Sequence, residues 1–336
     1  MKINPVYRKE LKTSVRTVKL SWTIFAYNAI LAAIALLAFY VCFANRSRID
    51  YSEILTIYAF IACLEFGLIL FVVPALTSSA ISGERERQTL EILLTTTLKP
   101  IQIVTGKLWA SISEIVLLVL SSLPILSLVF TVGGIRIQDL FMLMLVCIAT
   151  AVFVGAIGVY FSTVFKRTVP ATVMTYGMLI ILMLVTIVAL YAVQVLMIHF
   201  YEQQFYAVNV TTNAAYNPPR IGYAMLILLW NPAVTIFSML TEQFGGNNAL
   251  MEIMKEFGMN NEFIINCWFQ LSILIQLATS GFLMLLSANQ LNPLKNGKKK
   301  SEKALARAEK REAKAAAKEL KKLEKREAKA TAKAEK

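Results

Sequence analysis

The chain has 336 residues, of which 57% are hydrophobic and 16% are charged, and its formal net charge is +13. This composition excludes an ordinary soluble domain and a disordered chain, and it indicates an integral membrane protein. The single histidine, His199, and four cysteines dispersed among apolar runs argue against a histidine-based hydrolase, a zinc site and a disulfide framework. We therefore expect no catalytic residues, no metal, and no nucleic-acid partner.

Residues 1–21 predict an amphipathic interfacial helix, with Asn4 as its N-cap and Pro5 at the first helical position. Apolar residues from Tyr7 to Trp22 recur along one side, and five basic residues occupy the other: Arg8, Lys9, Lys12, Arg16 and Lys19. That basic side either binds anionic headgroups or a cytoplasmic partner, or only marks the cytoplasmic flank of the first span.

Six apolar segments reach the length of about 20 residues that a helix needs to cross a bilayer. The predicted spans are residues 22–43, 54–77, 108–132, 140–165, 168–198 and 263–290. Glu65 lies near the middle of the second span, where an ionised side chain costs a few kcal/mol unless it meets water or a partner. Glu65 either lines a transport path or is a protonated, hydrogen-bonded residue inside the helix bundle.

The polar stretch 78–110 separates the second and third spans, and its charges cluster between Glu84 and Glu91. Leucines recur at three- and four-residue spacing, which predicts a helix over residues 82–98 lying on the membrane surface. Ser82 is the expected N-cap of this helix, Lys99 before Pro100 is its expected end, and a new helix is expected to begin at Pro100.

The run GERERQTLEILLTTTLKPIQIVTGKL resembles the cytoplasmic loop of type-2 ATP-binding cassette (ABC) permeases, and the N-terminal NPVYRKEL resembles the opening of that family. The loop positions that match are Gly83, Glu84, Arg85, Glu86, Thr89, Leu90, Glu91, Leu93, Leu94, Pro100, Gly106 and Lys107. The stretch before Pro100 is slightly longer than in the family pattern. The resemblance covers about the first 290 residues and implies an exporter subunit that pairs with a second permease copy or paralogue and with ATPase subunits.

The chain lacks the G-x-x-x-x-G-K-[ST] pattern of a nucleotide-cradling loop, because Gly106-Lys107 is followed by Leu108. We expect no cofactor on this chain, with ATP bound by a separate ABC ATPase subunit. The residues expected to dock that subunit, as the coupling helix of the resemblance, are Gly83, Glu84, Arg85, Glu86, Arg87, Thr89, Leu90 and Glu91. The alternative is a surface loop whose helix is merely stabilised by an Arg87–Glu91 pair.

Residues 199–261 form the expected extracellular segment, and within it the apolar run 221–241 is interrupted by Asn231-Pro232. With six spans and a cytoplasmic N-terminus, 12 basic residues lie inside before the tail and five lie outside. A full crossing by 221–241 would move the basic tail outside, against the positive-inside rule. We therefore expect 221–241 to be a re-entrant or extracellular helical hairpin.

Residues 295–336 hold 17 of the 34 basic residues and predict a frayed, solvated helical tail rich in Lys, Ala and Glu. The sequence as a whole predicts an all-α, six-span protein of the plasma membrane with both termini cytoplasmic and residues 22–294 as its transmembrane domain. The function predicted is the permease subunit of an ABC exporter. The alternative is a membrane anchor or scaffold that recruits acidic partners or anionic lipids through its tail.

Overall fold

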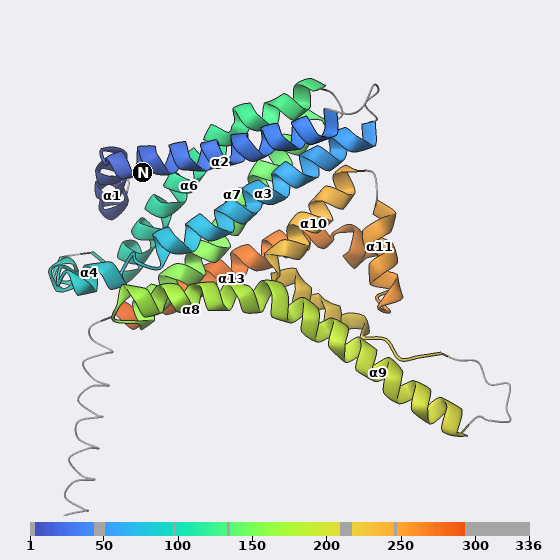
Figure 1. Ribbon diagram of the computed structural model, residues 1–336. Coiled ribbons are helices and arrows are strands. Elements are labelled where there is room, and N and C mark those ends of the chain that lie inside the picture. Colours follow the sequence, from blue (N-terminus) through green and yellow to red (C-terminus); the bar gives the residue numbers. More distant parts are fainter. Residues whose placement is uncertain are drawn as a thin grey trace, which may run out of the picture. The chain divides into compact units, whose positions relative to one another are not determined.

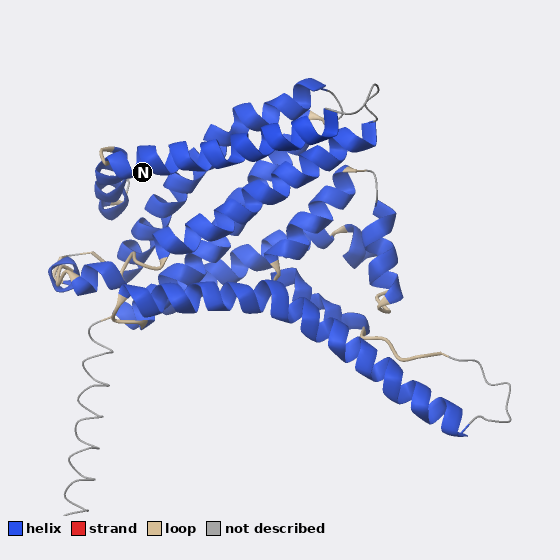
Figure 2. Cartoon of the chain, viewed as in Figure 1, coloured by secondary structure: helices blue, strands red, loops and turns tan. Residues whose placement is uncertain are grey.

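The structure is a computed structural model that describes residues 4–43, 51–96, 98–132, 135–208, 217–244 and 247–292. The predicted tail helix lies outside these residues. The described part consists of helices joined by loops, as Figure 2 shows, and contains no strand, which confirms the predicted fold class. Its helices are α1 (Pro5–Val15), α2 (Val18–Phe43), α3 (Tyr51–Thr77), α4 (Ser82–Glu86), α5 (Leu90–Leu94), α6 (Pro100–Val132), α7 (Ile137–Val164), α8 (Thr168–Ile180), the π-helix η1 (Ile181–Val185), α9 (Thr186–Val208), the 3₁₀-helix η2 (Gly222–Trp230), α10 (Pro232–Gln243), α11 (Asn247–Glu256), α12 (Glu262–Asn266) and α13 (Trp268–Leu291).

Six helices of the described residues are long and apolar enough to cross a membrane, which confirms the number of predicted spans. They are α2, α3, α6, α7, the continuous α8–η1–α9 helix and α13. The third of these begins at Pro100, as predicted, because proline has the helical φ angle and lacks the N–H group that a first helical residue leaves unpaired. The fifth continues beyond residue 198 to the end of α9.

Helix α7 is the most buried of the six and packs against α3, α6 and α8 (Figure 1). Two glycines on α7 let α3 and α6 approach closely, as expected for small residues in a membrane bundle. A Cβ atom at Gly155 would lie 3.0 Å from Leu108, and one at Gly158 would collide with the Thr77 side chain. By contrast, α2 and α8–α9 leave most of their surface uncovered within the protomer.

The expectation of one amphipathic helix over residues 1–21 is wrong, because the chain turns between Val15 and Val18 to form α1 and α2. The predicted cap is confirmed, since the Asn4 side chain accepts a hydrogen bond from Val6 N and Pro5 begins the helix. Contacts with α6 determine where α1 lies. Asn4 Nδ2 donates to Gln102 O over 2.6 Å, and the Tyr7 hydroxyl lies 3.1 Å from Ser113 Oγ.

The predicted break at Asn231-Pro232 is confirmed, and η2 and α10 meet there at an angle of 100°. Asn231 is fully buried and its side chain accepts hydrogen bonds from Ala233 N and Val234 N, which caps α10. Its amide nitrogen donates to Met183 O over 3.1 Å and to Thr186 Oγ1 over 3.0 Å. Asn231 therefore joins the bend to the π-helical segment of the long helix, where the altered backbone pattern presents a carbonyl oxygen to a partner.

Candidate functional site

The polar loop forms two short helices, α4 and α5, so the expectation of one helix over residues 82–98 is wrong. Gln88 has φ +59°, Thr89 N donates to Glu84 O, and Gln88 N donates to Arg85 O. This is the Schellman pattern that ends a helix, with glutamine at the position that usually holds glycine. Because no glycine marks this position, the helix end was not predicted from the sequence. The expected cap is also displaced: Ile81 is the N-cap and Ser82 is already helical.

Two charged residues of α4 hold the loop onto the ends of α7 and α8. Arg85 donates to Phe165 O over 3.0 Å and to Thr163 O over 3.2 Å, where α7 ends. The Glu86 carboxylate accepts from Thr168 N over 2.9 Å and from the Thr168 hydroxyl, where α8 begins. A cation at a helix C-terminus and an anion at a helix N-terminus both suit the helix dipole. The α4 helix is therefore fixed to the turn between α7 and α8.

Lys107 is the charged centre of this region, and the sequence interpretation gave it no role although its Gly106-Lys107 pair belongs to the matched pattern. It lies on α6, is 6% exposed, and its ammonium nitrogen lies 3.0 Å from both Glu10 on α1 and Glu84 on α4. Thr89 also donates to Glu84. One buried cation thus joins α1, α4 and α6. The sequence could not pair Lys107 with Glu10 and Glu84, because these residues are distant in the chain and meet only in the folded protein.

Replacing Lys107 with Gln is expected to lower the stability of the protein by about 1–3 kcal/mol, because two carboxylates lose a charged hydrogen-bond donor. Thermal unfolding of the purified protein in detergent measures this change. Lys99→Gln is the matched control, since Lys99 is exposed in the same region. Equal unfolding temperatures for the two variants would contradict a structural role for the Lys107 contacts.

The opposite side of the loop is open to solvent. Arg87, Gln88, Thr89, Glu91 and Ile92 are exposed, and Ile92 is 69% exposed. Leu90 is buried and Gly83 is partly buried, so the eight residues predicted for docking divide between an anchored side and an exposed side. Arg87 and Glu91 lie on either side of the Gln88 turn, which removes the helical spacing on which the alternative interpretation relied.

A model of the ABC-2 family transporter proteins matches residues 4–288. The chain belongs to this family. The match covers all the described helices from α1 to α12 and most of α13, and it confirms the resemblance found in the polar loop. No curated protein matches the chain significantly. The protein is therefore a multi-pass membrane permease subunit of an ABC-2 transporter.

A cavity of about 510 Å³ lies behind the loop of this ABC-2 permease, between α1, α3, α4, α6 and α8. Its lining carries charges of both signs, namely Glu10, Glu84, Glu86, Arg87, Lys107 and Glu114. Glu114 accepts a hydrogen bond from Ser14 in the last turn of α1.

Glu65 lies far from this loop along α3, inside the core of the ABC-2 permease, and is fully buried. Ser122 on α6 donates to Glu65 Oε1, and the buried Tyr27 hydroxyl of α2 lies close by. The second carboxylate oxygen, Oε2, has no hydrogen-bond partner in the described structure. Glu65 thus belongs to a small polar cluster shared by three of the spans.

Proposed function

We propose that this permease subunit belongs to an ATP-driven exporter of the plasma membrane and that the exposed side of α4–α5 docks the ABC ATPase subunit. The observation that carries the proposal is the division of the loop into an exposed side and a side bonded to the ends of three long helices. A loop that only lay on the membrane surface would not need these contacts with α6, α7 and α8. A loop that receives force from a partner needs them to pass that force into the bundle.

The contacts of the loop define the route by which the force would pass into the bundle. Movement of α4 would pull the end of α7 through Arg85, the start of α8 through Glu86, and α6 through Glu84 and Lys107. Charged hydrogen bonds of this kind are short and directional, so they transmit displacement better than loose apolar contacts. The α7 helix, packed along most of its length, would carry the displacement to the far end of the bundle.

The proposal assigns ATP to the partner, because the chain has no nucleotide-cradling loop. It also includes a second copy of the permease or a paralogue, and it places both termini and α4–α5 in the cytoplasm, in keeping with the excess of basic residues there. The large uncovered surfaces of α2 and α8–α9 leave room for membrane lipids and for a second permease.

Affinity purification of the tagged permease from its own membranes tests the function directly. We expect an ATPase subunit to co-purify, and we expect a single cysteine placed at Gln88 to react with a membrane-impermeant maleimide only in inside-out vesicles. Labelling of that cysteine from the exterior of intact cells, or full transport activity of the permease reconstituted without any ATPase, would refute the proposal.

We also propose that Glu65 takes part in gating, since its cluster joins α2, α3 and α6 and leaves one carboxylate oxygen unpaired. Glu65→Gln is expected to lower transport by roughly tenfold, or about 1.4 kcal/mol of barrier, with expression unchanged, because the amide oxygen still accepts from Ser122. Transport into inside-out vesicles provides the measurement. Glu202→Gln, at an exposed acid on α9, is the control, and full activity of Glu65→Gln would eliminate the role.

A further inference from the structure

A second cavity, of about 430 Å³, lies among α9, η2, α10 and α11. Figure 1 shows α10 and α11 on the opposite side of the bundle from α4. We call this cavity the α9–α11 cavity. Every side chain of its lining is aliphatic, aromatic or methionine, and the hydroxyl of Tyr191 is the only side-chain oxygen or nitrogen in it. The volume is within the range of ligand-binding cavities, about 300–1,000 Å³. A lining of this kind offers dispersion contacts and no polar recognition, so its occupant must present a hydrocarbon surface.

The walls and the rim of the cavity differ in exposure. Met225, Leu250 and Met254 form buried walls, whereas Tyr191 is 62% exposed and Phe237 is 44% exposed at the rim. Next to this rim, the long helix exposes apolar side chains that include Leu184 on η1 and Val188 on α9, each more than 60% exposed. The cavity is therefore continuous with a surface that a bilayer would cover, and its occupant would arrive laterally from lipid.

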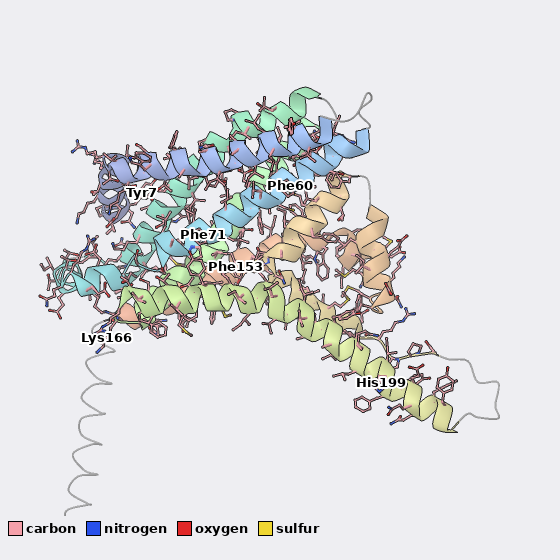
Figure 3. The ribbon with its side chains drawn as sticks, in the orientation of Figure 1. Tyr7, Phe60, Phe71, Phe153, Lys166 and His199 are labelled. Atoms are coloured by element: carbon pink, nitrogen blue, oxygen red, sulfur yellow. The ribbon has the colours of Figure 1, made fainter. Side chains whose placement is uncertain are left out.

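The position of the cavity along α9 agrees with a membrane depth just inside the hydrocarbon region. The helix becomes polar from His199 onward, which Figure 3 labels toward the far end of α9, and Tyr191 precedes it by about 12 Å along the axis. Tyrosine and histidine are residues that favour the boundary between hydrocarbon and headgroups. A chain entering beside Tyr191 would leave its headgroup near that boundary.

Charged residues of both signs lie next to the lining at the same end. Arg220 precedes the lining residue Ile221, and its guanidinium donates to Lys255 O over 3.0 Å. Lys255 itself follows the lining residue Met254, and the acids Glu252 and Glu256 are exposed on the same helix. The Lys255 ammonium lies 3.3 Å from Glu262 Oε1, so the surface here presents paired charges of both signs. Such a surface complements a zwitterionic headgroup better than an anionic one.

We propose that the α9–α11 cavity holds one acyl chain of a zwitterionic phospholipid taken from the surrounding leaflet. The lipid would fill the space beneath the bent η2–α10 pair and support its position against α9. The inference depends on the protein lying in a bilayer, and it is independent of the docking of an ATPase at α4–α5.

Photocrosslinking in nanodiscs tests the proposal, with a phosphatidylethanolamine that carries a diazirine near the end of one acyl chain as the probe. We expect crosslinked peptides to concentrate in residues 221–230 and 250–257. In Ala233→Trp, where the indole fills the cavity, labelling of these peptides should fall by about tenfold, equivalent to ~1.4 kcal/mol of binding free energy. The matched control is Ala278→Trp, the same change at an exposed position of α13.

The outcomes separate the possibilities. Equal labelling of wild type and Ala233→Trp, or labelling spread evenly over the exposed faces of α2 and α8, would overturn the proposal. If Ala233→Trp unfolds at a lower temperature than wild type, Val234→Phe fills the same cavity with a smaller increase in volume, and its labelling decides the question. Stronger labelling by a phosphatidylglycerol probe with the same chains would overturn the assignment of the headgroup. We expect the ATPase to co-purify with Ala233→Trp as it does with wild type, since the cavity is not part of the proposed docking surface. The test of lipid binding is then independent of the test of ATPase docking.

Discussion

A permease carrying Glu91→Arg and Ile92→Ser is expected to lose its ATPase subunit during purification. Both residues are exposed on the side of the loop that is not held by α6, α7 or α8, and Ile92 is the large apolar side chain of that side. Reversing one charge and removing one apolar anchor at the centre of an interface costs about 2–4 kcal/mol, or roughly 30- to 1,000-fold in affinity. Quantitative mass spectrometry of the purified complex measures the ATPase that remains.

The control for this prediction is a permease with Glu202→Arg and Phe200→Ser, the same types of change at two exposed positions of α9. This variant should retain the ATPase, because α9 extends away from the loop. If both double variants retained it equally, docking through the exposed side of α4–α5 would be ruled out.

Arg85→Gln separates docking from transmission. Arg85 contacts the carbonyl groups of Thr163 and Phe165, and its position in the loop is partly buried. We expect this variant to keep the ATPase but to transport poorly, since the link between α4 and the end of α7 is weakened. Loss of the ATPase together with transport would instead mean that Arg85 itself belongs to the docking surface.

Asn231→Leu is expected to have the largest effect on stability, about 2–4 kcal/mol. The substitution removes a helix N-cap, which alone contributes about 1 kcal/mol. It also leaves the partly buried Met183 carbonyl and Thr186 hydroxyl without the donor that Asn231 supplies, at a cost of about 1–3 kcal/mol. Thermal unfolding of the purified protein measures the loss.

Asn261→Leu is the matched control for Asn231→Leu, because Asn261 also caps a helix through its side chain but is exposed to solvent. It should cost only the cap. A third variant, Asn231→Ser, keeps an oxygen for the cap and removes the amide donor, so it should fall between the two. Equal unfolding temperatures for Asn231→Leu and Asn261→Leu would show that the bridge from Asn231 to the long helix adds nothing.

Sequence reasoning succeeded where local chemistry decides the structure. Hydropathy gave the six spans because a bilayer requires a minimum length of apolar helix. Asn4-Pro5 predicted a helix start, since asparagine caps the backbone N–H groups and proline needs none. Asn231-Pro232 predicted a break, because proline lacks the backbone donor that a continuous helix uses. The family resemblance likewise rested on a contiguous run of residues in one loop.

The errors of sequence reasoning share one physical cause. The helix predicted over 82–98 breaks at Gln88 because Arg85 and Glu86 are held by groups of α7 and α8 that lie about 80 residues further along the chain. Such contacts override a modest local preference for a continuous helix. The turn after Val15 is similar, since α1 follows the surface of α6 rather than the line of α2.

The sequence by itself determined that the described residues include six helices long and apolar enough to cross a membrane, that the protein belongs among permeases, and which loop carries the charged pattern. These properties depend on composition, length and adjacent residues. Only the tertiary structure decided which side of that loop is free, that Lys107 joins three helices, and that an apolar cavity opens beside α9. Those features depend on residues that are distant in the chain and meet only when the helices pack.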